Sequence, residues 1–165
     1  MEKPSFITNR TIDDVKRWKT LRDKGWHRMT DGERREWMGE IETTPAATRG
    51  MYTHNDLNRM EKAIEAISLR FKEAGYDTPE LNTKTDWTYR DTVTKTDMER
   101  CLQNVLTLRD FFIIFPDTPN VPSIDVRLNY ELANDIEKIL KDVYSIADGI
   151  VRARYYAGEI VSGEV

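Results

Sequence analysis

The sequence predicts an all-α protein, a helical bundle of about four to five helices with extended N- and C-terminal segments. A helix-start motif of the form T-x-x-D recurs along the chain, and apolar residues follow it at alternating spacings of three and four. That spacing places apolar side chains on one face of a helix. We expect residues 1–10 to be an extended segment, residues 11–154 the bundle, and residues 155–165 an extended tail.

The repeated motif marks helix N-termini. It begins at Thr11, Thr53 and Thr94, and in each case an apolar residue, one variable residue and an arginine follow the aspartate. The threonine oxygen can accept a hydrogen bond from an amide of the first turn, while the aspartate accepts one from the threonine amide and suits the positive end of the helix dipole. A shorter box, from Thr30 to Glu33, predicts a fourth helix start.

Apolar stripes follow the starts at Thr53 and Thr94 and recur in a last helix, which we expect to begin near Asn129. The last stripe is the most regular and consists of Leu132, Ile136, Ile139, Val143, Ile146 and Ile150. Heptad spacing of this kind suits antiparallel bundle packing as well as a coiled coil. We favour a bundle core, because three helices here need one another's stripes. The single cysteine, Cys101, lies on an apolar face, which predicts core packing.

Loops interrupt this pattern at residues 42–50, 76–93 and 116–122. The segment 76–93 is long for a bundle connection, which indicates a functional loop or one held by a partner, with a partly disordered linker as the alternative. It contains Trp87, Tyr89 and Arg90. The Trp87 ring either folds back onto the bundle, which we favour, or anchors an interface, where Trp, Tyr and Arg dominate binding energy. We take all three residues as interface candidates.

The C-terminal segment differs in character from the helices. A tetrad of a small residue, glycine, glutamate and an apolar residue occurs twice, at residues 157–160 and 162–165. Two glycines argue against a helix, yet the segment is too apolar for a solvated tail. An extended segment that pairs with the sheet edge of another chain satisfies both facts, and a frayed terminus is the alternative. The further interface candidates are Tyr155, Tyr156, Ile160 and Val161.

The sequence predicts no catalytic, cofactor-binding or metal-ligating residues, and we expect no enzyme activity and no small-molecule substrate. His27 and His54 lie in different helical units without a partner at i+4. The acidic pairs Glu36 with Glu40 and Glu61 with Glu65 have the spacing that a helical metal-dependent nucleotide hydrolase uses. Glu61 and Glu65 lie off the apolar stripe, however, and we expect both to face solvent.

Charge and hydropathy exclude two classes of partner. The net charge is −4, with basic and acidic residues interspersed, whereas a nucleic-acid surface needs a concentrated basic patch. There is no run of ~20 apolar residues to span a bilayer, and the first residues lack the apolar run of a secretory signal. We therefore expect no nucleic acid, no membrane, and a location in the cytoplasm of the cell that makes the protein.

The order of several segments resembles a known family. These segments are Asn9 to Val15, Tyr52 to Arg59, Thr85 to Trp87, Asp97 to Arg100, Ala133 to Leu140, and the ending Tyr156 to Ile160. Together they resemble small structural proteins encoded in the tail modules of prophages of Gram-positive bacteria. The resemblance covers nearly the whole chain, apart from residues 43–50 and 116–122, and rests on helix caps and apolar stripes.

This resemblance implies a phage or phage-tail-like structural protein, associated with the tail tip or baseplate and without catalytic residues. Its partners would be other phage structural proteins or copies of itself, and it would move from the bacterial host cytoplasm into the virion tail during assembly. Two alternatives stay open: a cytoplasmic helical adaptor or regulatory module, and a metal-dependent helical nucleotide hydrolase. Rescue of a host pathway by the free monomer would favour the adaptor, and divalent-metal binding would favour the hydrolase.

Overall fold

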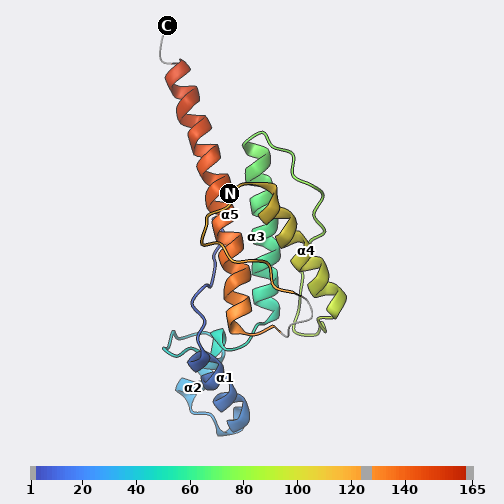
Figure 1. The fold of residues 1–165 in the computed structure, drawn as a ribbon. Helices are drawn as coiled ribbons and strands as arrows, with labels where there is room; N and C mark the ends of the chain where they lie inside the picture. Colours follow the sequence, from blue (N-terminus) through green and yellow to red (C-terminus); the bar gives the residue numbers. More distant parts are fainter. Residues whose placement is uncertain (1–2, 124–127, 163–165) are drawn as a thin grey trace.

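The computed structural model describes residues 3–123 and 128–162, and this part of the chain is helical without strands. The elements are α1 (Ile12–Lys24), η1 (Trp26–Arg28), α2 (Asp31–Trp37), η2 (Ala47–Arg49), α3 (His54–Glu73), α4 (Lys95–Phe111) and α5 (Tyr130–Ser162). Of these, η1 and η2 are short 3-10 helices. The predicted all-α fold class is confirmed, and Figure 1 shows α3, α4 and α5 side by side with α1 and α2 at one end.

Capping boxes begin the helices where the sequence predicts them. In α1, α3 and α4 the aspartate accepts a hydrogen bond from the backbone amide of the capping threonine, at 2.8 Å for Thr11, 2.7 Å for Thr53 and 2.9 Å for Thr94. Thr30 and Glu33 form the fourth box at the start of α2. Each box satisfies amides that a helix N-terminus otherwise leaves unpaired.

The helices α3 and α5 form the centre of the main bundle and run parallel to each other. Glu137, near the start of α5, pairs with Arg59 near the start of α3 at 2.6 Å. Asp148, further along α5, pairs with Arg70 near the end of α3 at 3.0 Å. Successive pairs therefore advance in the same direction along both helices.

The helix α4 also points this way, so the antiparallel packing suggested by the heptad spacing is wrong. Phe71 and Phe111, near the C-terminal ends of α3 and α4, have ring centroids 5.1 Å apart. A parallel neighbour requires the connecting chain to return along the whole preceding helix. The 20 residues of α3 span about 30 Å, and extended chain covers about 3.3–3.6 Å per residue, so the return needs about nine residues or more. This requirement explains the long connections before α4 and α5.

The bundle core is built from the predicted stripes. Its fully buried members include Ile64, Ile67, Phe71, Cys101, Val105, Leu108, Ile136, Ile139 and Leu140. Cys101 is 0% exposed, as its place on the apolar face predicts. The predicted start near Asn129 is also confirmed, because the Asn129 side chain accepts a hydrogen bond from the Leu132 amide at 2.8 Å.

Residues 12–50 form a small N-terminal lobe with a core of its own. Leu21, Met29 and Ala47 are buried there, and Trp18 and Trp37 pack against them. This cluster is separate from the core of the bundle. The lobe lies beside the N-terminal ends of α3 and α5, at the lower end of the molecule in Figure 1.

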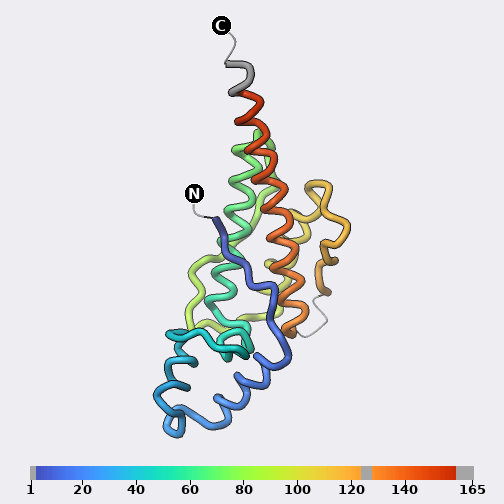
Figure 2. The backbone as a smooth tube through the Cα atoms, turned by 90° about the vertical axis from the view of Figure 1, so that its left-hand side faces the viewer, coloured from blue at the N-terminus to red at the C-terminus, as the bar shows by residue number. Residues whose placement is uncertain are grey.

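Residues 3–10 form an extended N-terminal strap along α3 and α5, as Figure 2 shows in dark blue. The Ile7 amide donates a hydrogen bond to Glu137 Oε2 at 2.6 Å. Asn134 of α5 accepts from the Arg10 amide at 3.0 Å and donates to the Arg10 carbonyl at 2.9 Å. The predicted extended N-terminal segment is therefore present, and it is held by side chains of α5.

The extended C-terminal tail is wrong for the residues that the structure describes. The backbone from Tyr155 to Ser162 continues α5 as a helix, despite Gly158. A helix that is already nucleated gains one hydrogen bond for each residue it adds, and a glycine within it is only about 1 kcal/mol less favourable than alanine. Residues 163–165, which complete the second glycine tetrad, lie outside the described residues.

Candidate docking surface

The helix α5 extends beyond the end of α3. Asp148 lies level with Arg70, since their side chains pair at 3.0 Å, and α3 ends at Glu73. Equal rise in two parallel helices places Val151 level with this end, and Val151, at 4% exposure, is the last buried residue among the α5 side chains that the structure describes. We call residues 152–162 the overhang. It is about 16 Å long at about 1.5 Å per residue, and Figure 1 shows it in red above the bundle.

Two large aromatic side chains stand on the overhang. Tyr155 is 72% exposed and Tyr156 is 66% exposed. The structure places the backbone of Ile160 and Val161 in the same helix, and their side chains lie outside what it describes. The sequence-predicted candidates of this segment therefore share one helical element, although its conformation differs from the one predicted.

Tyr155 continues a seam of residues that are buried inside the bundle. Val143, Ala147 and Val151 are 1%, 0% and 4% exposed, and residues four apart lie on the same helix face. Tyr155 is the next residue at this spacing. The seam therefore passes from buried to exposed at the level where α3 ends.

Two arginines, Arg152 and Arg154, lie at the base of the overhang. Gly75, in the turn after α3, has a φ of +82°, and a Cβ there would lie 2.5 Å from Arg154 Nη1. A cation in this place interacts favourably with the negative end of the α3 dipole. Arg152 pairs with Asp148 at 2.8 Å within α5. In the sequence the overhang carries Arg152 and Arg154 against Glu159, within a chain of net charge −4.

Trp87 is not part of an exposed interface. It is 4% exposed and packs in the bundle core. Asn58 of α3 holds its backbone, because the Trp87 amide and carbonyl each form a 2.8 Å hydrogen bond with the Asn58 side chain. The favoured prediction, a ring that folds back onto the bundle, is confirmed, and the interface-anchor alternative is wrong.

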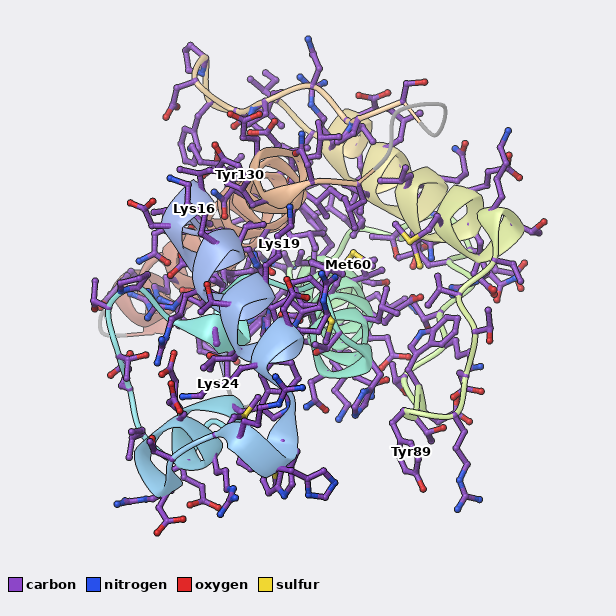
Figure 3. All side chains as sticks on the ribbon, turned by 90° about the horizontal axis from the view of Figure 1, so that it is seen from below. Lys16, Lys19, Lys24, Met60, Tyr89 and Tyr130 are labelled. Carbon is purple, nitrogen blue, oxygen red and sulfur yellow. The ribbon has the colours of Figure 1, made fainter. Side chains whose placement is uncertain are left out.

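Tyr89 and Arg90 occupy an exposed turn at the other end of the bundle. Tyr89 is 76% exposed, and Arg90 Nε donates to its hydroxyl at 3.0 Å. Figure 3, seen from below, shows Tyr89 at the periphery and pointing away from the bundle. The turn adjoins the starts of α3 and α4, whereas the overhang lies beyond their ends. The structure therefore separates Tyr89 and Arg90 from Tyr155 and Tyr156.

Glu61 is fully buried, so the expectation that it faces solvent is wrong. Arg100 of α4 donates to both Glu61 oxygens at 3.2 and 2.5 Å, and Cys101 Sγ donates to Glu61 Oε1 at 2.7 Å. Burial, reinforced by the Glu61 carboxylate, raises the pKa of the Cys101 thiol far above its ordinary value. Because α3 packs against both α4 and α5, its buried surface is wider than one apolar stripe. Glu65 is exposed, as predicted.

A second buried group of charges joins the strap to α3 and α5. Arg10, 4% exposed, donates to Asp56 at 2.9 Å and to Glu137 at 2.7 Å. Arg59 donates to the same two carboxylates, at 2.6 Å each. Two positive and two negative charges thus balance in the interior. No sequence pattern indicates this cluster, because an arginine just before a capping threonine is not distinguishable from a surface residue.

A groove of about 830 Å³ separates part of the N-terminal lobe from the start of α3. Its lining includes Met38, Met51, Arg49 and Arg59. Both arginines already have partners, since Arg49 pairs with Glu42 and Arg59 with the buried carboxylates. Arg152 of the overhang is likewise paired, with Asp148, so the overhang differs from the groove by its two exposed tyrosines, Tyr155 and Tyr156.

Among the side chains that the structure describes, no group of three or more histidine, cysteine or acidic residues is placed to hold a metal ion. Among the helices described, none has both the length and the apolar content needed to cross a membrane. Comparison of the chain with protein families, with curated proteins and with solved structures finds no match.

Proposed function

We propose that this protein is a structural component of a phage tail or phage-tail-like particle, associated with the tail tip or baseplate, and that it acts by binding other subunits. The family resemblance of the sequence supports this class. The observation that carries the docking role is the overhang, which presents Tyr155 and Tyr156 at 72% and 66% exposure on a continuous helix.

The physical chemistry of the overhang suits protein recognition. Tyrosine and arginine are enriched among the residues that dominate binding energy, and the overhang carries two of each. Because the helix is continuous with a packed core, little backbone entropy remains to be lost on binding. Docking then follows the helix-packing mode of recognition in place of the strand addition that an extended tail would use.

We also propose that the protein has no catalytic activity. The two acids with hydrolase spacing do not form a joint site. Glu61 accepts hydrogen bonds from Arg100 and Cys101 in the interior, whereas Glu65 accepts one from Thr83 at 2.6 Å on the surface. Assays with nucleotides and divalent metals test this proposal. Metal-dependent turnover that is lost in Glu61→Gln would refute it.

The docking role can be tested in the bacterium that encodes the chain. The gene is inactivated and replaced by the full chain, by a chain ending at Val151, or by a Lys141→Gln control on the exposed face of α5. Particles are then induced, purified and analysed by quantitative mass spectrometry. We expect the full chain and the control in the particles, and the truncated chain only at background, with equal amounts of all three in the cells. Absence of the full chain from particles, or normal incorporation of the truncated chain, would refute the proposal.

A further inference from the structure

We infer that the overhang receives a helix of a different protein subunit, that this helix lies in line with α3, and that its contacting face is apolar and acidic. The inference rests on the proposed docking function and specifies the partner's chemistry. It is carried by the buried seam of α5, which continues past the end of α3, and by the arginines at that end.

The seam shows where the partner lies. Exposure along it is 1% at Val143, 0% at Ala147 and 4% at Val151, and then 72% at Tyr155. α5 is one continuous helix through these residues, whereas the neighbouring helix α3 ends at Glu73. The contact face of α5 is therefore continuous with an interface that already accepts helices. Ridges of side chains at three- and four-residue spacing pack into the grooves of another helix, so a helix is the element that fits beside Tyr155.

The charges around the seam show what the partner carries. Arg154 lies over the turn that ends α3, and Arg152 lies one turn before Tyr156 on the overhang. A helix in line with α3 and running in the same direction would place its first turn beside these arginines. Aspartate and glutamate are the side chains favoured in a first helical turn, because they interact with the positive end of the dipole. An acidic first turn thus suits both its own helix and Arg154.

The same charges argue against two arrangements of a second copy, one with its overhang packed in parallel and one with the start of its α3 beside the arginines. Two overhangs packed in parallel would bring Arg152 and Arg154 of both copies close together, and like charges at such spacing are unfavourable. The start of α3 offers no alternative, because its first-turn acid, Asp56, is 5% exposed and paired with Arg10 and Arg59. A different, acidic subunit has neither disadvantage.

Adjacent tyrosines provide a matched test. Tyr155 and Tyr156 have similar exposure but point about 100° apart on the helix, so only Tyr155 lies on the seam. We expect Tyr155→Ala to lower incorporation into particles at least about tenfold in competition with wild type, as for an interface hot spot. Tyr156→Ala should lower it less than about threefold, and both variants should melt as wild type does. Equal losses, or a larger loss for Tyr156→Ala, would overturn the inference.

Photo-crosslinking in assembled particles identifies the partner directly. Benzoylphenylalanine is placed at position 155, and at position 145 on the exposed face of α5 as a control. The expected product at position 155 joins a different protein, at a segment with helical apolar spacing and more Asp and Glu than Lys and Arg. Three outcomes would overturn this inference while leaving the proposed function standing: a product with a second copy, a product with a basic segment, or no product in particles that contain the chain. Absence of the chain from particles would instead refute the proposed function.

Discussion

At the residue scale, the interior charges tie the N-terminal strap to the bundle. Glu137 receives hydrogen bonds from Arg10, from Arg59 and from the Ile7 amide. Its side chain is 2% exposed. A buried ion pair adds little net stability over apolar packing, but removal of one member leaves a charge buried without its partner. The fold therefore depends on Glu137 more than on any surface acid of α5.

We expect Glu137→Gln to lower the free energy of unfolding by about 3 kcal/mol, because Arg10 and Arg59 would keep only Asp56 as a countercharge. Urea denaturation measures this change. Glu131→Gln, an exposed acid on the same helix, is the matched control and should stay within about 0.5 kcal/mol of wild type. A loss below about 1 kcal/mol in Glu137→Gln would show that the cluster is not holding the strap.

Cys101 should resist alkylation in the folded protein. Its thiol is buried, and burial together with Glu61 raises its pKa, so the reactive thiolate is scarce even in mildly alkaline buffer. Mass spectrometry after iodoacetamide treatment should show an unmodified native chain and complete modification in urea. Rapid modification of the native chain would mean that α4 does not cover this side chain as described.

At the element scale, the N-terminal lobe is stabilised by carboxylates whose protonation is unfavourable. A hydrogen bond from Lys24 and one from the Thr30 amide lower the pKa of Glu33 to about 2. The Arg17 guanidinium lowers the pKa of Glu36 below its ordinary value. Both groups thus contribute stability that is present above their unfolded pKa, near 4.5, and is lost as the pH falls through the folded pKa.

The melting temperatures of wild type and Glu36→Gln should therefore converge in acid. The difference between them should be largest above about pH 5 and should shrink toward pH 2, because protonated Glu36 loses the charge that the variant also lacks. Trp18, Trp26 and Trp37 lie in the lobe, so tryptophan fluorescence follows its unfolding. A difference that stays constant from pH 7 to pH 2 would contradict the role of the pair with Arg17.

The sequence predicts the local features of these elements better than their arrangement. The Thr11, Thr53 and Thr94 boxes and the stripe of α5 are recognisable because caps and apolar spacing involve residues within one or two turns. Helix direction is not encoded there, since the same stripe fits a parallel or an antiparallel neighbour. The length of segment 76–93 carried that information, because only a parallel neighbour requires a return of such length.

Local reasoning missed the helical conformation of the overhang, and although it predicted the burial of Trp87, it did not identify the residue that holds Trp87. Gly158 suggested an extended tail, but the preceding helix sustains the overhang through it. The burial of Trp87 depends on Asn58, which is distant in sequence. Exposure of Tyr155 and Tyr156 was compatible with the sequence, whereas their position beyond the end of α3 follows only from the pairing of Arg70 with Asp148.

At the scale of the whole molecule, the bundle has the lobe at one end and the overhang at the other (Figure 1). The described side chains of the overhang, from Arg152 to Gly158, are exposed, so they add little to the core. A chain ending at Val151 should therefore melt within about 2 °C of the full chain. Val143→Asp, which places an unpaired charge in the core, should by contrast lower stability by several kcal/mol or prevent folding. Strong destabilisation of the truncated chain would mean that the overhang supports the fold.

The most direct test of the docking role is hydrogen exchange of residues 152–162 in the free protein and in purified particles. In the free protein the side chains described for this helix, at residues 152–158, are exposed, so its amides should exchange far faster than those of α3. In particles we expect exchange around Tyr155 to slow at least about tenfold, a change that a bound helix produces by suppressing local opening. The exposed turn at Tyr89 provides an internal reference. Equal exchange of the overhang in both states, in particles that contain the chain, would contradict the account.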